Sequence, residues 1–238
     1  MTVTPYDSDG SKREQVEHMF DAISPKYDLL NRVFSLGIDQ SWRRKVIRLV
    51  GREPVQHLLD VATGTADLAI LAAKKVPRVV GVDISEGMLA HGRVKVKERG
   101  MEDRITLQRA DSAALPFAKD TFDAITVAFG VRNFEQLEKG LSEMRRVLKP
   151  NGRLFVLEFS KPRKAPMKQL FRFYFHHVMP TIGRIVSRNS AAYTYLPKSV
   201  DAFPEGAEFV RILGSIGLRE AKADALTGGI ATLYSARK

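Results

Sequence analysis

The chain has 238 residues, of which 44% are hydrophobic and 27% are charged, a balance that fits one α/β domain with a well-buried core. Because it contains no cysteine, disulfide bonds, thiolate zinc sites and a cysteine nucleophile are excluded. It has no run of about 20 apolar residues to span a bilayer, and its first residues lack the basic and apolar regions of a secretory signal. We therefore expect a cytoplasmic protein, attached at most peripherally to the inner face of the plasma membrane.

The net charge of +11 fits two kinds of partner, nucleic acid or an anionic membrane surface. Between Glu158 and Asp201 the chain has no acidic residue but several basic ones: Lys161, Arg163, Lys164, Lys168, Arg172, Arg184, Arg188 and Lys198. The same segment is rich in aromatic residues, including Phe171, Phe173, Tyr174 and Phe175. Positive charge and aromatic surface therefore coincide. The alternative to a partner site is a solvated basic face on a helical cap.

The first 50 residues predict short helices that break at Pro25 and Gly37 and cover the mouth of a site. From residue 55 onward, short β-branched runs alternate with helical stretches, which is typical of a parallel sheet with crossover helices. The predicted strands are 55–62, 78–85, 104–111, 121–129 and 151–160. The predicted helices between them are 66–75, 86–100 and 134–150, the last of which is stopped by Pro150.

After the basic aromatic segment, the pattern predicts a helix over 205–217 and two strands over 218–226 and 228–238. A Thr-Gly-Gly turn joins these two strands, so they can only pair antiparallel. The expected fold is α/β and Rossmann-like, a mostly parallel seven-stranded sheet with an antiparallel last strand. We expect a single domain over 1–238, divided into four parts: a helical cap (1–50), a cofactor-binding core (55–160), a substrate lid or membrane-facing insertion (161–200), and a C-terminal helix with its strand pair (201–238).

Open α/β sheets bind ligands at the carboxyl ends of their strands, so the turn after the first strand, 60–67, is the first place to search for a site. This turn contains a single glycine, Gly64, where a dinucleotide fold has three spaced glycines near the pyrophosphate. The missing glycines argue against NAD and favour a cofactor without phosphates, such as S-adenosylmethionine. Gly64 would allow a close backbone approach, and Asp60 and Thr65 would contact the charged methionine end. The alternative is that Gly64 is only a steric requirement of the turn.

Two further acidic residues follow successive predicted strands. Asp83 ends the second strand, where a carboxylate can accept hydrogen bonds from both ribose hydroxyls of a nucleoside cofactor. Asp111 ends the third strand, where it or its neighbour Ser112 can meet the adenine amino group. A single acid at a strand end is often a helix cap, but three on successive strands favour a nucleoside site.

Four blocks of sequence carry a resemblance to a known family: MFDAISPKYDLLNRVFSLGID (19–39), LLDVATGTADLA (58–69), AFGVRNF (128–134) and YTYLPKSVDAFP (193–204). With these blocks the chain resembles the class I methyltransferases and, more narrowly, the ubiquinone/menaquinone biosynthesis C-methyltransferase family. The resemblance implies an S-adenosylmethionine-dependent transfer of a methyl group to a ring carbon of a polyprenylated quinol. The implied product is menaquinol, made from demethylmenaquinol, or alternatively the corresponding ubiquinone precursor.

By motif position, the resemblance assigns Thr65, Asp83, Asp111 and Ser112 to the cofactor. One departure concerns Ala128, where some relatives that act on both quinones carry serine, so a hydroxyl on the cofactor side is absent here. This difference weakens a dual-substrate assignment and favours the naphthoquinol. The chain length of the polyprenyl tail and the general base stay open.

Methyl transfer to a quinol carbon requires a positioned acceptor whose phenolic proton is removed or polarised. Arg132 and Asn133 follow the fourth predicted strand, where Arg132 would stabilise the phenolate and Asn133 would orient its oxygen. The alternative is that Arg132 only caps, or forms a salt bridge with, the helix that opens at Phe134. Tyr27 and His177 are weaker candidates, and no metal site is legible from the sequence.

A nucleic-acid methyltransferase is the first rival class, since the basic segment would suit it. The turn after the fourth strand, 128–131, has the sequence AFGV rather than the Asn-Pro-Pro-aromatic loop that grips an exocyclic amine, and no cysteine is present to attack cytosine. A methyltransferase for another small molecule is a further alternative, and a non-catalytic binding module is the last. We expect a quinol substrate, transient contact with an anionic membrane and no nucleic acid; whether the protein is a homo-oligomer is left open.

Overall fold

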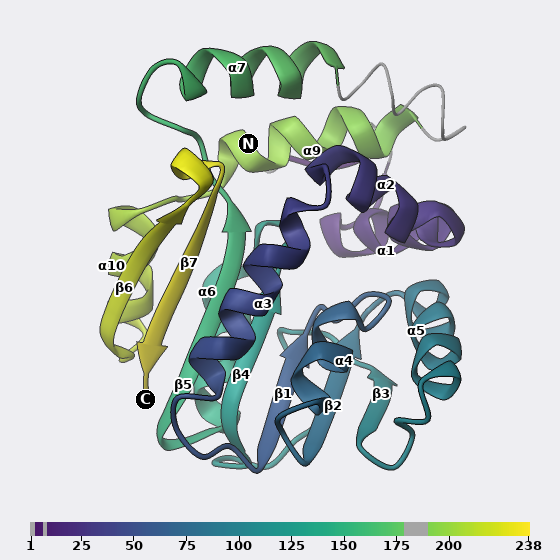
Figure 1. Ribbon diagram of the computed structural model, residues 1–238, viewed down its shortest axis with the longest axis vertical. Helices are drawn as coiled ribbons and strands as arrows, with labels where there is room; N and C mark the ends of the chain where they lie inside the picture. The colour runs from purple at the N-terminus through teal and green to yellow at the C-terminus, as the bar shows by residue number, and fades with distance from the viewer. Residues whose placement is uncertain (1–2, 7–8, 179–189) are drawn as a thin grey trace.

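A seven-stranded sheet with helices on both faces forms the centre of the protein (Figure 1), in a computed structural model that describes residues 3–6, 9–178 and 190–238. The strands are ordered β3-β2-β1-β4-β5-β7-β6. Their bounds are β1 His57–Val61, β2 Arg78–Asp83, β3 Ile105–Arg109, β4 Phe122–Ala128, β5 Leu148–Phe159, β6 Arg219–Leu226 and β7 Ala231–Arg237. Strand order reverses between β1 and β4, the point at which open α/β sheets bind ligands.

The predicted pairing of strands is confirmed. Strands β1 to β5 are parallel, whereas β7 is antiparallel to both of its neighbours, β5 and β6. One boundary differs from the prediction, because the helix expected to reach Pro150 ends at Val147 and β5 starts at Leu148. Proline disfavours helical backbone in the residue before it, and Leu148 is already extended and pairs with Phe122 on β4.

Helices cover the two faces of the sheet as crossover connections require (Figure 1). Their bounds are α3 Ile38–Val50, α4 Asp67–Ala73, α5 Glu86–Glu98, α6 Leu137–Val147 and α10 Ala207–Ser215. The first of two large apolar clusters joins α3, α4 and the end of α5 to the sheet, and the second joins α6 and α10 to it. On α6, Leu141, Met144 and Val147 recur at three-residue spacing and are fully buried, which explains why this segment forms an amphipathic helix.

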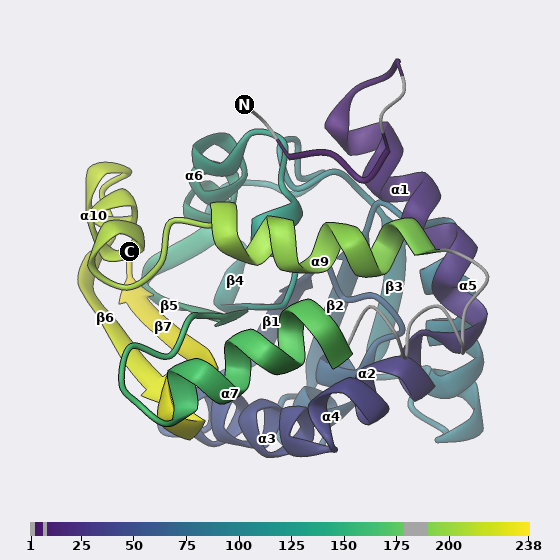
Figure 2. The same cartoon turned by 90° about the horizontal axis from the view of Figure 1, so that it is seen from above.

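A second group of helices lies over the carboxyl ends of the strands (Figures 1 and 2). It consists of α1 Lys12–Ile23, the short turn η1 Ser24–Lys26, α2 Tyr27–Ser35, α7 Met167–Phe173, η3 Tyr174–Val178 and α9 Ser190–Ala202. The predicted breaks are confirmed, since Pro25 lies in η1 and Gly37 separates α2 from α3 with a left-handed φ of 75°. Within the predicted cap of residues 1–50, α1 and α2 form the cover, whereas α3 packs on the face of the sheet.

Gly130 determines how closely the turn after β4 approaches the turn after β1. A Cβ added at Gly130 would lie 2.4 Å from the Cβ of Ala62, well inside van der Waals contact. Only glycine therefore allows the two turns to touch at the switch point. This contact places the short helical turn η2 Val131–Asn133, with Arg132 and Asn133, directly beside the crevice between β1 and β4.

Candidate functional site

Two adjoining pockets lie between the strand ends and the covering helices. The first has an empty volume of about 840 Å³ and is lined by residues after β1, β2, β3 and β4 together with α1 and Tyr27. The second, of about 1720 Å³, lies between α2, α3, α7 and α9 and has mostly apolar walls. Both volumes include space open to solvent. Phe20, Tyr27, Phe129 and Asn133 line both pockets, so the pockets meet at these side chains.

The first pocket brings together most of the cofactor residues expected from the sequence. Gly64, Asp83, Asp111 and Ser112 all line it, although they follow three different strands. Gly64 has a left-handed φ of 55°, and a Cβ built there would meet nothing closer than the Tyr27 ring at 3.8 Å. The backbone of this turn is therefore presented to the pocket, as expected for a close approach to a ligand.

Asp83 is held in place by backbone donors. Its carboxylate accepts hydrogen bonds from the backbone nitrogen of Gly64 at 2.8 Å and from that of Ser85 at 3.0 Å. Burial nevertheless raises the pKa of Asp83 to about 6, and the nearby carboxylate of Asp21 adds to the shift. Each carboxylate oxygen accepts more than one hydrogen bond, so the group can still receive hydroxyl donors from a ligand.

Asp60 and Thr65 have other contacts than those expected from the sequence. Neither Asp60 nor Thr65 is among the described residues that line the first pocket. Asp60 is buried and accepts hydrogen bonds from Thr63 at 2.7 Å and from Thr126 on β4 at 2.6 Å, and burial raises its pKa to about 6. Through the hydrogen bond with Thr63, Asp60 stabilises the turn after β1. Contact of Asp60 and Thr65 with a cofactor stays a prediction.

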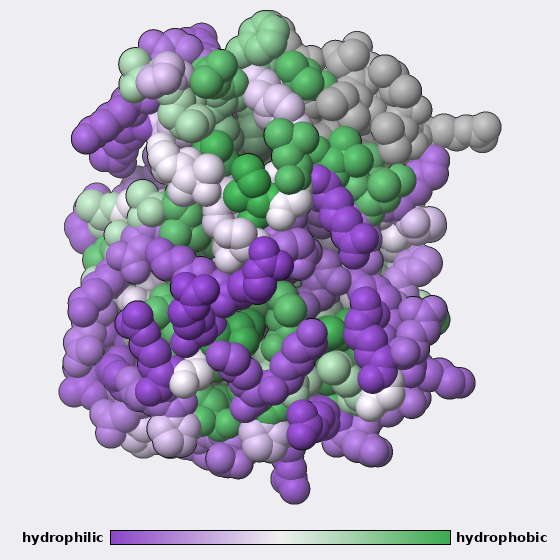
Figure 3. Space-filling view, in the orientation of Figure 1, coloured by the Kyte–Doolittle hydropathy of each residue, from purple (hydrophilic) through white to green (hydrophobic). Residues whose placement is uncertain are grey.

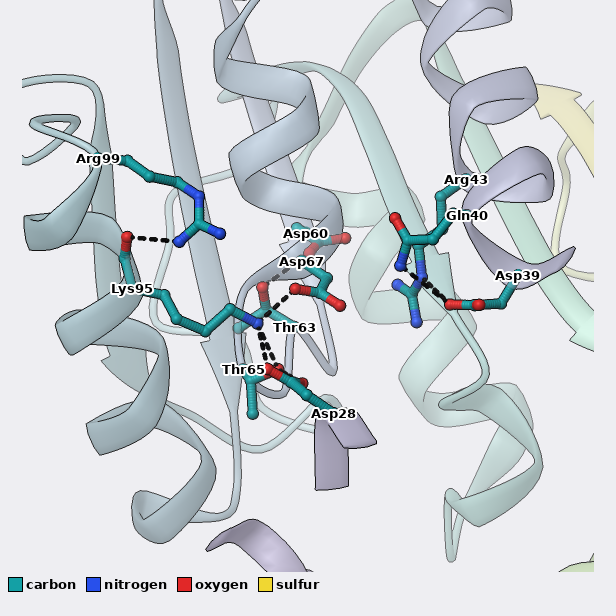
Figure 4. A network of polar contacts seen from close by, with 10 residues as sticks. All are labelled: Asp28, Asp39, Gln40, Arg43, Asp60, Thr63, Thr65, Asp67, Lys95 and Arg99. Carbon is teal, nitrogen blue, oxygen red and sulfur yellow. Dashed lines mark hydrogen bonds and ion pairs between the residues drawn. The ribbon is translucent and has the colours of Figure 1, made fainter. Parts of the chain in front are cut away.

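Thr65 belongs to a polar network that ties α2 to the turn after β1 (Figure 4). Its hydroxyl donates to Asp28 on α2 at 2.6 Å. The ammonium group of Lys95 on α5 bonds to Asp28, Thr65 and Asp67. Burial alone would raise the pKa of Asp28, but hydrogen bonds from Lys95 and Thr65 hold this pKa below its usual value of 3.8. Lys95 is therefore the cation that joins the carboxylates of Asp28 and Asp67 in this network.

A second carboxylate anchors the cover to the sheet. Asp21 at the end of α1 accepts hydrogen bonds from the Ser85 hydroxyl at 2.5 Å and from the backbone nitrogen of Gly87 at 2.9 Å. At the other end of α1, the ammonium of Lys12 donates to the carbonyl oxygen of Arg132 at 3.1 Å. Sequence reasoning missed Asp21 and Asp28, and the sequence signals them only as acidic residues within helices predicted to cover the mouth of a site.

Aromatic rings form a continuous wall along the second pocket. The Phe129 and Phe159 rings are 4.6 Å apart, Trp42 packs against both, and Phe159 continues to Phe175 at 6.0 Å. Phe171 stacks on Phe175 with ring centroids 4.4 Å apart. Such a wall suits a flat, apolar ligand.

Arg132 forms a buried ion pair with a residue that the sequence analysis did not single out. Its Nη1 atom donates to Glu158 at 2.8 Å and to the carbonyl oxygen of Phe129 at 2.5 Å, and Glu158 at the end of β5 is fully buried. The alternative interpretation expected Arg132 to cap, or form a salt bridge with, the helix that opens at Phe134. The observed ion-pair partner is Glu158 instead. The guanidinium plane lies over the Phe159 ring, 5.6 Å from its centroid, so Glu158 and Phe159 together orient it along the pocket wall.

Three polar atoms of residues that line the second pocket are buried without a hydrogen-bond partner in the described part of the chain. They are Nε of Arg132, Oδ1 of Asn133 and the hydroxyl oxygen of Tyr195, and all three residues line this pocket. A buried polar group without a partner costs about 1–3 kcal/mol, and such groups are few in folded proteins. Three such atoms on residues around one apolar pocket indicate a site for a polar head group.

Tyr27 lies where the two pockets meet. Its ring packs edge-on against Phe20, 6.1 Å away. Burial raises the pKa of Tyr27, and a hydrogen bond with Asn31 opposes that shift. As for metals, the described residues contain no group of three or more histidine and acidic side chains that can hold an ion.

Replacing Lys95 tests whether the network in Figure 4 holds the cover in place. The change Lys95→Met leaves Asp28 and Asp67 without their cation, and we expect the free energy of unfolding to fall by about 1–3 kcal/mol near neutral pH. Because the depressed pKa of Asp28 contributes stability only above the unfolded value, the difference should shrink as the pH falls through about 3.8. Urea denaturation measures both effects.

The matched control for this prediction is Lys97→Met, which removes an exposed cation from the same helix. It should change the free energy of unfolding by less than about 0.5 kcal/mol. Equal stability of the Lys95 and Lys97 variants would contradict a structural role for the network.

Comparisons with known proteins agree with this geometry. A sequence model of the ubiE/COQ5 methyltransferase family matches residues 8–238. The chain is 50% identical to a demethylmenaquinone methyltransferase of Bacteroides fragilis, over 99% of this chain and 97% of that protein. It is 46% identical to a ubiquinone/menaquinone biosynthesis C-methyltransferase of Geobacter sulfurreducens, over 95% of this chain and 90% of that protein.

A solved structure supports the fold assignment. The crystal structure of a SAM-dependent methyltransferase from Thermotoga maritima matches with a TM-score of 0.67 at 18% identity, covering 93% of this chain and 99% of that one. The fold, predicted as a Rossmann-like methyltransferase sheet, is thus shared with a methyltransferase of distant sequence. The nearly full-length match to the family model and the high identity to its members assign the chain to the ubiE/COQ5 methyltransferase family, as an enzyme that uses S-adenosylmethionine.

Proposed function

We propose that the protein methylates a ring carbon of a polyprenylated quinol and converts demethylmenaquinol to menaquinol. The observation that carries this proposal is the second pocket, an apolar aromatic channel that adjoins the first pocket and has three unpartnered polar atoms on residues of its described lining. A quinol has the matching shape, with hydroxyl groups on a flat ring and a long apolar tail. The name of the Bacteroides fragilis relative supports this choice of substrate.

The residues of the first pocket fit S-adenosylmethionine. Asp83 would accept hydrogen bonds from the ribose hydroxyls, Asp111 and Ser112 would meet the adenine, and the backbone at Gly64 would pass close to the cofactor. The bound cofactor supplies an electrophilic methyl group on a sulfonium centre. The methyl group has to be aimed at the junction of the two pockets, which Phe20, Tyr27, Phe129 and Asn133 surround.

Arg132 and Asn133 would prepare the acceptor. A phenol has a pKa near 10, so a cation beside its oxygen favours the phenolate, which places electron density on the adjacent ring carbon. The guanidinium of Arg132, held by Glu158, offers its unpartnered Nε–H to such an oxygen, and the unpartnered Oδ1 of Asn133 would orient the hydroxyl group of the incoming quinol at the pocket junction by accepting its hydrogen. The ring carbon gains the methyl group and loses its hydrogen as a proton, so the product is again a quinol.

The methoxy-benzoquinol precursor of ubiquinone is the alternative acceptor. Ala128, the residue that favoured the naphthoquinol in the sequence, lines the first pocket rather than the second. Its missing hydroxyl therefore bears on the cofactor side of the site and not on the quinol ring. The apolar walls of the second pocket favour the larger fused ring, because each added buried carbon contributes roughly 0.8 kcal/mol.

The substrate assignment is tested by supplying the two quinols separately with labelled cofactor. We expect label to enter demethylmenaquinol faster than the methoxy-benzoquinol. In the variant Arg132→Lys, which keeps a positive charge beside Glu158, kcat should fall roughly 100-fold or more while the dissociation constant of the cofactor stays within about threefold. Transfer of label to RNA and to neither quinol would overturn the proposed function, and unchanged kcat would remove Arg132 from it.

The affinity for the cofactor should depend on the ionised form of Asp83. Because burial raises its pKa to about 6, lowering the pH through about 6 protonates this carboxylate and removes an acceptor for the ribose hydroxyls. We expect S-adenosylmethionine to bind more weakly below that pH, as measured by calorimetry. Asp83→Asn should weaken binding by about ten- to a hundredfold at neutral pH and flatten the pH dependence.

Asp60→Asn is the comparison for this experiment, because Asp60 has a similarly raised pKa but bonds to Thr63 and Thr126 instead. If the pH dependence persists in Asp83→Asn and disappears in Asp60→Asn, Asp83 is not the ribose ligand.

We also infer that the mouth of the second pocket rests on an anionic membrane. Exposed apolar side chains surround this mouth. They lie on both sides of Gly37, between α2 and α3, and on α7: Leu36, Ile38, Leu170 and Phe173. In Figure 3 hydrophobic residues gather in the upper part of the molecule, whereas its lower part is mostly hydrophilic. Arg163, Lys164, Lys168 and Arg172 are exposed beside the mouth, and Arg184 and Arg188 lie outside the described residues.

A polyprenyl tail favours such an arrangement, because it is too apolar to leave the bilayer at low free-energy cost. The enzyme would then draw only the head group into the pocket. Within the described residues, no helix has the length and hydropathy needed to span a bilayer. Attachment would instead depend on surface charge, to which each basic residue near an anionic leaflet contributes about 1 kcal/mol.

Flotation with liposomes tests this inference. Binding should require anionic lipid and decrease with added salt, and it should weaken when Arg163, Lys164 and Lys168 are changed to Glu. A matched control reverses three exposed lysines elsewhere, Lys74, Lys75 and Lys97, and should bind better than the first variant at equal net charge. Equal binding of the two variants would contradict a localised docking surface.

A further inference from the structure

Of the three unpartnered atoms around the second pocket, the hydroxyl of Tyr195 has been given no contact of its own with the substrate. Tyr195 belongs to α9, which crosses over the carboxyl ends of the strands and packs against η2 (Figure 2). Its ring is buried among apolar residues of α1 and α2, including Val16, Met19 and Leu30. Its hydroxyl reaches the second pocket, is buried, and lacks a hydrogen-bond partner within the described chain.

A phenylalanine would fill the same apolar surroundings without burying an unpartnered hydroxyl. The hydroxyl is therefore a cost to the ligand-free protein. Burial raises the pKa of Tyr195 to about 12, so the group stays protonated and can donate a hydrogen bond. A donor kept unsatisfied at a pocket wall, beside the Arg132 and Asn133 atoms that also lack partners, indicates a further contact with the ligand.

The position of Tyr195 relative to the two pockets separates its role from that of Asn133. Asn133 lines both pockets and so lies at the end where the methyl group arrives. Among the described lining residues, Tyr195 and its neighbour on α9, Leu196, belong to the second pocket alone, as does Arg132 on η2. Because Tyr195 approaches this pocket from α9 and not from η2, a hydrogen bond from it would meet the ligand at another place than the groups of η2 do.

A prenylated quinol has a second oxygen that is not beside the acceptor carbon. One of its hydroxyl groups is beside the acceptor carbon, and the other is on the opposite side of the ring, beside the carbon that carries the prenyl tail. We propose that Tyr195 is a positioning residue that binds this second oxygen, an inference that rests on the proposed quinol substrate. With Arg132 and Asn133 at one oxygen and Tyr195 at the other, the ring has a single orientation, in which the tail leaves along α7 and the acceptor carbon faces the cofactor.

Two reduced ligands distinguish the oxygens when binding is measured without oxygen gas. The first is demethylmenaquinol with a short prenyl chain. The second is the matching 3-prenyl-1-naphthol, which keeps the hydroxyl beside the acceptor carbon and lacks the one beside the prenyl-bearing carbon. The wild-type protein should bind the quinol roughly three- to tenfold more tightly than the naphthol, the size expected for one neutral hydrogen bond.

In Tyr195→Phe, the affinity for the quinol should fall to that for the naphthol, whereas the affinity for the naphthol should not change. The melting temperature of the ligand-free variant should stay equal or rise, because a buried unpartnered hydroxyl is removed. Tyr234→Phe is the matched control, since the Tyr234 hydroxyl accepts a hydrogen bond from the backbone nitrogen of Gly206 at 2.7 Å and Tyr234 belongs to the apolar cluster beneath α6 and α10. That variant should melt at a lower temperature and keep the preference for the quinol.

Several outcomes would overturn the role of Tyr195. An equal loss of affinity for both ligands in Tyr195→Phe would place its hydroxyl at the reacting oxygen, and no loss for either would remove it from the site. A lower melting temperature of the ligand-free variant would indicate a structural hydroxyl. Failure of the proposed function is seen separately, because the wild-type protein would then transfer no labelled methyl group to the quinol.

Discussion

The buried carboxylate of Asp60 joins the two strands between which the strand order reverses. It lies on β1 and accepts hydrogen bonds from Thr126 on the neighbouring β4 and from Thr63 in the turn that follows β1. Burial raises its pKa to about 6 although hydrogen bonds and the charge of Arg43 oppose the shift, so the protein retains a group that is costly to ionise. These hydrogen bonds hold the turn after β1 in place. Gly130 packs against this turn, and the backbone of Gly64 in the same turn faces the first pocket.

The cover depends on the same edge of the sheet. Asp21 and Asp28 reach down from α1 and α2 to the donors that follow β2 and β1, so two carboxylates of the cover are satisfied by groups of the core. Both pockets are closed by cover residues, among them Phe20 and Tyr27. Neither pocket exists on the sheet alone, and the methyl donor and the quinol ring would meet in a space from which α1, α2 and α9 exclude water. Low local polarity strengthens the attraction between Arg132 and a developing phenolate.

The sheet could be predicted from the sequence because its signals are local. Apolar β-branched runs and a Thr-Gly-Gly turn determine strands and their direction, and strand-end acids such as Asp83 follow from the fold class. The polar partners could not be predicted in this way. Glu158 is hidden inside an apolar strand and meets Arg132 only through the parallel pairing of β4 with β5. Asp28 and Lys95 are 67 residues apart and appear in sequence as ordinary helix-surface charges.

The unpartnered polar atoms around the second pocket link ligand binding to stability. Two elements supply these atoms, which have no hydrogen-bond partner among the described residues: η2 supplies Nε of Arg132 and Oδ1 of Asn133, and α9 supplies the hydroxyl of Tyr195. A head group that satisfies all of them would add hydrogen bonds that connect the cover with the loop after β4. In the ligand-free protein these polar atoms lack such hydrogen bonds. The liganded enzyme is then the better-satisfied state of the same fold. Because the wall that leads to these atoms is aromatic and apolar, a ligand gains contact area along its whole ring before its polar end is bound, which favours one orientation over the reverse.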